Sequence, residues 1–148
     1  MNNDKKYSQF ALVREMMQTP EILRRFRLQN ADEVVSLIRK NKKLFFTGEG
    51  SSRIFPAKNA MYCARRAGYD LNLVAEGGLQ ACSYDLSDFI VFGASNSGQT
   101  KEVITLFERL NRINHRHLYA LTANRNTKLE SLARQTFVLS CEKEQAVA

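Results

Sequence analysis

The spacing of apolar residues along the chain changes near residue 41. Before that point apolar residues recur at helical spacing, and Thr19-Pro20 has the composition of a helix cap and first turn. This spacing predicts three helical segments, at 8–18, 20–29 and 31–41. Beyond it, short apolar runs predict five strands, at 42–48, 70–76, 88–95, 116–124 and 136–141. Amphipathic segments between the strands predict helices at 51–68, 77–84, 100–114 and 127–134. Pro56 is expected in the first turn of the helix at 51–68.

Short apolar strands that alternate with helices predict an α/β fold, in which a parallel sheet is covered by helices on both faces. We expect a doubly wound, flavodoxin-like sheet of five strands in the order 2-1-3-4-5, preceded by a helical lead-in over residues 1–30. In such a sheet, ligands bind at the carboxyl ends of the strands, where the strand order reverses. That switch point lies between the first and third strands.

Both strands that flank the predicted switch point end in loops rich in glycine and serine. The first strand is followed by TGEGSSR (47–53) and the third by GASNSGQT (93–100). Glycine lets backbone approach a ligand, amides at a helix start attract anions, and hydroxyls donate to phosphate oxygens. Neither loop matches G-x-G-x-x-G or G-K-[ST]. These features favour a small phosphate ester over a dinucleotide or ATP.

An alternative interpretation of the hydroxyl side chains is local. Ser51, Ser52 and Thr100 each precede or begin a predicted helix, where a hydroxyl can cap free backbone amides. Three neighbouring side chains have open roles as well. Arg53 and Lys58 either reach the phosphate or remain solvated, and Glu49 is a candidate contact for a sugar hydroxyl.

Composition excludes several classes of protein. The 148 residues are 44% hydrophobic and 25% charged, as in ordinary globular domains. The net charge of +7 suits an anionic ligand, but the chain has no block of five like charges, which disfavours a nucleic-acid tail. Three widely separated cysteines without a C-x-x-C pair argue against structural zinc and indicate a reducing cytoplasm. No signal-peptide core is present at the start, and no run approaches the roughly 18 apolar residues of a membrane span.

The two loops resemble those of the SIS, or sugar isomerase, domain family. The family's first loop is G-x-G-[ST]-S and its second is S-x-S-G-x-T-x-[ED]. The matching residues here are Gly48, Gly50, Ser51, Ser52, Ser95, Ser97, Gly98, Thr100 and Glu102. The resemblance extends to LVAEGG, which ends the second strand with Glu76, to LTANRNTKLESLA, and to CEKEQAVA, which is similar to the E-x-x-V-A after the fifth strand. It runs from about residue 31 to the end.

The resemblance implies a domain that binds a small sugar phosphate without a cofactor or a metal. Its phosphate-binding residues would be Ser95, Asn96, Ser97 and Thr100, and the first loop would contribute Gly50, Ser51 and Ser52. Glu144 falls where isomerising members keep the carboxylate that moves a proton between C1 and C2. That proton lies next to a carbonyl, so its removal needs a base such as a carboxylate with a raised pKa. The local alternative for Glu144 is a solvated acid at a helix start. A homodimer in the cytoplasm is also implied.

The sequence departs from the family pattern at its end. Relatives continue from E-x-x-V-A into S-T-K and a long helix, and the ring-opening histidine of several members lies there, whereas this sequence stops at Ala148. We therefore expect residues 31–148 to be a SIS phosphosugar-binding domain without its C-terminal helix, either truncated or the first half of a longer protein. This chain alone is not expected to hold a complete active site. His115 and His117 are expected at the surface or sheet edge.

Three functions remain open at this point. The first is part of a sugar-phosphate aldose–ketose isomerase or an amino-sugar phosphate deaminase/isomerase. The second is a phosphosugar-binding or sensing module without chemistry; residues 1–40 lack the features of a recognition helix that a regulator would add. The third is a nucleotide- or nucleic-acid-binding fold driven by the positive charge, which predicts a steep dependence of binding on salt.

Overall fold

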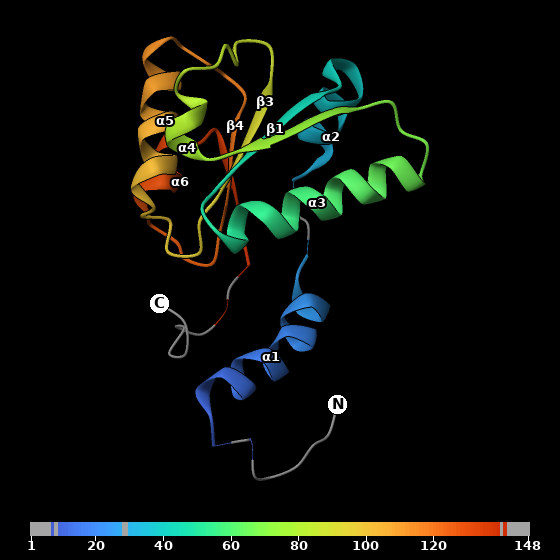
Figure 1. The fold of residues 1–148 in the computed structure, drawn as a ribbon, viewed down its shortest axis with the longest axis vertical. Coiled ribbons are helices and arrows are strands. Elements are labelled where there is room, and N and C mark those ends of the chain that lie inside the picture. The colour runs from blue at the N-terminus through green and yellow to red at the C-terminus, as the bar shows by residue number, and fades with distance from the viewer. Residues whose placement is uncertain (1–6, 8, 28–29, 140, 142–148) are drawn as a thin grey trace.

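The chain folds around a five-stranded parallel sheet with the order β2-β1-β3-β4-β5 (Figure 1). The computed structural model describes residues 7, 9–27, 30–139 and 141. The strands are β1 (Lys43–Thr47), β2 (Asn72–Glu76), β3 (Ile90–Ala94), β4 (Leu118–Thr122) and β5 (Gln135–Val138). The predicted fold class and strand order are confirmed. The predicted fifth strand, 136–141, was placed slightly late, and Ser140 lies outside the described residues.

Helices cover both faces of the sheet (Figure 1). One face carries α4 (Gly78–Ala81), α5 (Lys101–Arg112) and α6 (Lys128–Leu132), and the other carries α2 (Asp32–Asn41) and α3 (Ser51–Arg66). This division follows from right-handed crossovers, because the connection from β1 to β2 runs in the opposite direction to those that follow. The strand order therefore places the helix after β1 and the helix after β3 on opposite faces.

Two apolar clusters hold these layers together. Under α5, the side chains of Phe45, Val91 and Phe107 are fully buried. On the other face, Phe46, Phe92 and Tyr119 stack side by side across three strands, with ring centroids 5.6 Å and 5.3 Å apart. Strand residues alternate between the two faces, so one apolar run supplies both clusters. This double burial explains why the strands are continuous apolar runs.

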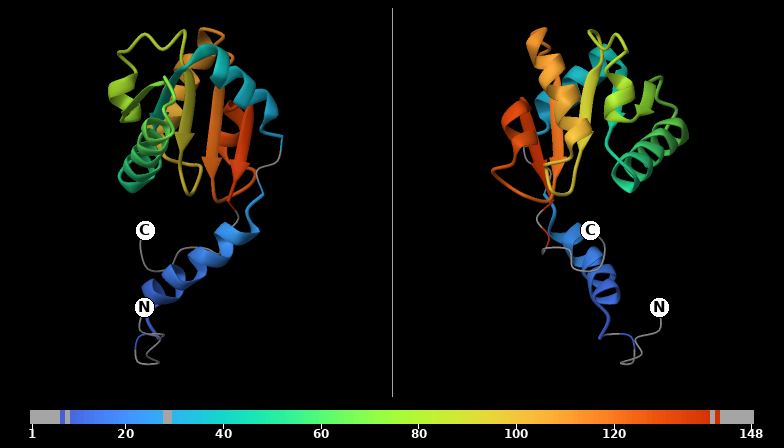
Figure 2. Two further views of the ribbon diagram at one scale, coloured as in Figure 1. Left: turned by 90° about the vertical axis from the view of Figure 1, so that its right-hand side faces the viewer. Right: turned by 60° about the vertical axis from the view of Figure 1, so that its left-hand side comes forward.

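The helix α1 (Ala11–Arg25) stands away from the sheet, and both views of Figure 2 show it extending beyond the strand ends. None of its residues is buried. It runs unbroken through Pro20, so the predicted break at Thr19-Pro20 is wrong. Proline has a helical φ, but inside a helix it removes one backbone hydrogen bond and its ring crowds the carbonyl of residue i−4, so Pro20 makes α1 less stable without ending it. Helix α3 begins at Ser51 as predicted, so Pro56 is its sixth residue and lies beyond the first turn in which it was expected.

Close packing between β3 and α5 gives a test of the fold. A Cβ added at Gly93 would lie 2.7 Å from the ring of Phe107 and 2.9 Å from Val103 Cγ1. We expect Gly93→Ala to lower the free energy of unfolding by about 1–3 kcal/mol, because a packed core resists an added methyl group. Urea denaturation followed by circular dichroism measures the change.

Gly68→Ala is the matched control. Gly68 has a positive φ of 72°, but its Cβ would have no neighbour within 4 Å. Its cost is therefore limited to backbone strain of about 1–2 kcal/mol. If Gly93→Ala were as stable as the native protein, the packing of α5 on β3 described above would be wrong.

Candidate ligand-binding site

The two serine-containing loops lie next to each other at the carboxyl edge of the sheet. The pairing of β1 with β3 places Thr47 beside Gly93, so loop 48–50 and loop 95–100 leave the sheet from neighbouring strands. Gly48 packs so closely against the end of β3 that a Cβ at this position would lie 2.9 Å from the carbonyl oxygen of Ala94. The expected convergence of the two loops therefore has a direct structural basis, which is backbone contact at glycine.

Loop 95–100 is held in shape by a hydroxyl pair. Ser95 is buried, and its Oγ lies 2.7 Å from Thr100 Oγ1. The backbone turns at Gly98, which has a φ of +65° and whose Cβ would lie 2.4 Å from Thr127. Each feature restricts the residue at its position. A larger side chain at Gly98 would clash with Thr127, and an apolar residue at position 95 would leave the Thr100 hydroxyl without this partner.

Residues after β4 anchor the same loop from its other side. The carbonyl oxygen of Asn96 accepts hydrogen bonds from Thr122 Oγ1 at 3.1 Å and from Asn124 Nδ2 at 2.9 Å. The amide of Ala123 donates to it as well, at 3.1 Å. Asn96 and Ser97 consequently sit at the exposed tip of a loop whose base is fixed. Sequence reasoning noted the stretch that contains Asn124 but missed this anchoring role.

The capping interpretation of the hydroxyl residues is wrong. The N-caps of α3 and α5 are Gly50 and Thr100, and neither makes a side-chain cap hydrogen bond. By contrast, Thr127 caps α6 by accepting from the amide of Glu130 at 3.2 Å. Two helix N-termini, with their partial positive charge, thus follow neighbouring strands at this edge without a side-chain cap. Ser51 is exposed and Ser52 is half-buried at the start of α3.

Charged residues near the first loop are engaged with one another. Arg53 Nη1 lies 3.2 Å from Glu76 Oε1, and Glu49 Oε1 accepts a hydrogen bond from the amide of Gly78 at 3.1 Å. The sequence left two roles open for Arg53, a solvated side chain or a contact to the phosphate. The structure shows a third, because Arg53 pairs with Glu76. Lys58 is exposed. Sequence reasoning missed both interactions, since no local pattern indicates partners 23 and 29 residues away.

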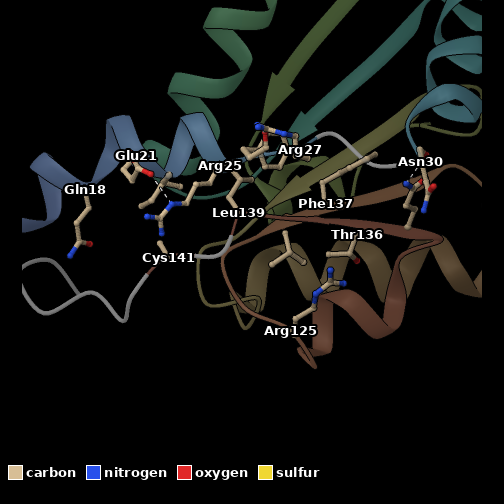
Figure 3. Close-up of a pocket in the computed structure, with 14 residues that line it drawn as sticks. Gln18, Glu21, Arg25, Arg27, Asn30, Arg125, Thr136, Phe137, Leu139 and Cys141 are labelled. Carbon is tan, nitrogen blue, oxygen red and sulfur yellow. Dashed lines mark hydrogen bonds and ion pairs between the residues drawn. The ribbon is translucent and has the colours of Figure 1, made fainter.

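A separate open cavity of about 760 Å³ lies between α1 and β5 (Figure 3). Its lining includes Arg25, Arg27, Arg125, Thr136 and Phe137. None of the predicted site residues that the structure describes lines this cavity. Arg25 pairs with Glu21 and Arg125 with Glu130, so two of these three arginines are already neutralised. The cavity therefore has no feature that ties it to the two loops.

The remaining candidates lie elsewhere. Glu144 falls outside the described residues, so its catalytic role stays a prediction. His115 and His117 are half-buried and immediately precede β4, at the amino ends of the strands, and His115 Nε2 lies 2.9 Å from the carbonyl oxygen of Leu86. Burial lowers the pKa of His117. Across the described part of the chain, no three His, Cys, Asp or Glu side chains gather in a way that could hold a metal ion.

Comparison with solved structures identifies the fold. A protein of Escherichia coli CFT073, solved with a bound sugar phosphate, has a TM-score of 0.68 and 23% identity over 97% of this chain and 78% of its own. The C-terminal domain of glucosamine-fructose-6-phosphate aminotransferase from Francisella tularensis has a TM-score of 0.73 at 16% identity, over 95% of this chain. The neighbours are phosphosugar isomerases and other SIS-domain proteins. The chain has the SIS-domain fold.

The SIS likeness lies in the structure more than in the sequence. The NanR protein of Vibrio vulnificus, complexed with ManNAc-6P, has a TM-score of 0.69 at 18% identity over 92% of this chain. The sequence itself matches no family model and no curated protein. This chain spans 42% of the aminotransferase domain and 53% of NanR. None of the helices in the described residues is both long and apolar enough to cross a membrane.

The hydroxyl pair of loop 95–100 can be tested by a double-mutant cycle. Ser95→Ala and Thr100→Val each remove one partner, and each should lower the free energy of unfolding by about 1 kcal/mol. The double variant should cost less than the sum of the two, by about 0.5–1 kcal/mol, because both changes delete the same hydrogen bond. Chemical denaturation of the four proteins measures the coupling. Strictly additive losses would contradict the observed pair.

Proposed function

We propose that the chain binds a sugar phosphate between loops 48–52 and 95–100 as part of a sugar-phosphate aldose–ketose isomerase or an amino-sugar phosphate deaminase/isomerase. The phosphate lies against loop 95–100, in contact with Ser95, Asn96, Ser97 and Thr100. The sugar extends toward Gly50, Ser51 and Ser52. No cofactor takes part.

One observation carries the proposal. The helices α3 and α5 follow the adjacent strands β1 and β3, neither has a side-chain cap at its N-terminus, and each is preceded by a loop of glycine and hydroxyl residues. A phosphoryl group placed there accepts hydrogen bonds from backbone amides and side-chain hydroxyls and interacts favourably with both helix dipoles. Gly50, with a φ of +52°, gives the first loop a backbone conformation that other residues adopt with strain. Sugar phosphates bound to two neighbours of the same fold add support.

The proposed reaction exchanges a carbonyl between C1 and C2 of the sugar. A base removes the proton from the carbon next to the carbonyl while the carbonyl oxygen takes up a proton, which gives an enediol. The base then returns its proton to the former carbonyl carbon, and the other hydroxyl loses its proton as the new carbonyl forms. We assign this proton transfer to the carboxylate of Glu144, because CEKEQAVA resembles the E-x-x-V-A segment in which isomerising members of the SIS family keep this carboxylate. The binding loops hold the substrate through its phosphate while the proton moves.

A second candidate is a phosphosugar-binding module without chemistry. It is favoured by the neighbour NanR, which is described by its complex with ManNAc-6P and not by a reaction. The two candidates share the binding site and differ only in turnover. A measurement of binding together with turnover separates them.

Phosphate recognition predicts a specific loss on mutation. The chain should bind fructose 6-phosphate and not fructose, as measured by isothermal titration calorimetry. Ser97→Ala should weaken binding about tenfold or more, because one hydrogen bond to a charged group is worth about 1.5–3 kcal/mol. Ser87→Ala is the control, since Ser87 is an exposed serine that precedes β3, at the other end of the strand. Equal binding of fructose and its phosphate would contradict the proposal.

Catalysis by Glu144 predicts a separation of binding from turnover. Glu144→Gln keeps the size of the side chain and removes the base, so interconversion of hexose phosphates should fall about 10²–10⁴-fold. The affinity for fructose 6-phosphate should change little. Coupled enzymatic assays of the aldose and ketose phosphates measure the rate. Equal rates of turnover by the native chain and by Glu144→Gln would contradict the assignment of the base to Glu144.

A further inference from the structure

We infer that Glu49 is a positioning residue that fixes the first ligand loop by tethering it to the start of α4. The inference rests on the proposed function, because it concerns how the same site is held ready for its ligand. It assigns Glu49 a structural contact within the protein in place of a contact with a sugar hydroxyl.

Loop 48–50 consists of one acidic residue between two glycines. Glycine has the largest backbone freedom of any residue, so a Gly-Glu-Gly segment has little conformational preference of its own. Gly48 is restrained by its contact with the carbonyl of Ala94. Gly50 has no atom within 4 Å of its Cβ position, so packing around that position does not restrain it. The side chain of Glu49 is thus a candidate for holding the second half of the loop.

The carboxylate of Glu49 reaches a fixed point on a different element. Its Oε1 accepts a hydrogen bond from the amide of Gly78 at 3.1 Å. Gly78 is buried, and a Cβ on it would lie 2.4 Å from the carbonyl oxygen of Glu102 in the first turn of α5. The anchor is therefore packed against the helix that begins at the second ligand loop. Through this contact, Glu49 relates the position of the first loop to the start of α5.

A second connection runs parallel to the first. Arg53, in the first turn of α3, pairs with Glu76 at the end of β2, and Glu76 Oε1 also accepts from the amide of Gly77 at 2.9 Å. The Arg53 and Glu76 side chains are 28% and 31% exposed, so this pair is partly shielded from water. The successive amides of Gly77 and Gly78 thus donate to the carboxylates of Glu76 and Glu49. This pairing connects the first turn of α3 to the end of β2.

Removal of the Glu49 tether should loosen the loop without unfolding the domain. Three backbone hydrogen bonds report on the loop directly: the amide of Ser52 donates to the carbonyl of Glu49, and those of Arg53 and Ile54 donate to the carbonyl of Gly50. Local opening breaks these bonds and exposes the amides to exchange with solvent. Hydrogen exchange at Ser52, Arg53 and Ile54 therefore measures the tether in the free protein, without any ligand.

The experiment compares Glu49→Ala, Glu49→Gln and the native chain by amide hydrogen exchange. Glu49→Ala should speed exchange at the three reporter amides about tenfold. Glu49→Gln should leave it near the native rate, because the glutamine carbonyl can still accept from the amide of Gly78. Glu108→Ala is the control: Glu108 pairs with Lys128 on the surface of α5, and its loss should leave the reporter amides unchanged. Native exchange in Glu49→Ala, or equal acceleration in both Glu49 variants, would overturn the inference.

The same variants then report on the ligand. If the tether positions the site, Glu49→Ala should weaken binding of fructose 6-phosphate about tenfold, and Glu49→Gln should restore it. Native-like binding by Glu49→Ala would show that the loop's position does not matter to the ligand and would also overturn the inference. Failure of the native chain to bind any hexose phosphate would count against the proposed function alone, since the exchange rates still decide whether the tether exists.

Discussion

The pairing of β1 with β3 is the constraint on which the candidate site depends. Parallel strands in register bring their carboxyl ends to one edge, and here that register places Thr47 beside Gly93. The loops that follow touch through backbone, because Gly48 has no side chain to separate it from Ala94. A residue with a Cβ at Gly48 would push the loops apart. The distance between two helix N-termini is thus set by a glycine and a strand register.

The two loops of the candidate site offer neutral donors more than full charges. The chain carries a net charge of +7, yet Arg53 and Arg125 are paired with Glu76 and Glu130. The groups left at the two loops are hydroxyls and backbone amides at helix starts. Such donors hold a phosphate by geometry, and they are less sensitive to salt than exposed lysines and arginines would be. The positive charge of the chain thus says little about the ligand, and the nucleic-acid alternative gains no support from the two loops.

The sheet was predictable because its information is local. Each strand is a short apolar run that ends in glycine or polar residues, and the strand order followed from the commonest doubly wound arrangement. Local reasoning failed at Pro20, where it predicted a break that α1 does not have. The alternative that Ser51, Ser52 and Thr100 serve as helix caps also failed, because α3 and α5 have no side-chain cap hydrogen bond. Local reasoning could not identify the contacts of Glu49 and Arg53, because their partners lie on α4 and β2, 29 and 23 residues away in the sequence.

The separation of α1 from the sheet has a consequence for the site. A helix of 15 residues with no buried side chain draws little stability from tertiary packing, and isolated helices of this length are marginal in water. The two loops, by contrast, are built on β1, β3 and β4 and on helices that pack in the apolar clusters. Opening of α1 therefore need not disturb the loops, since the hydrogen bonds described for the hydroxyl pair, the Asn96 carbonyl and the Glu49 carboxylate all join other elements. The geometry of the two loops therefore depends on the stability of the sheet and its covering helices.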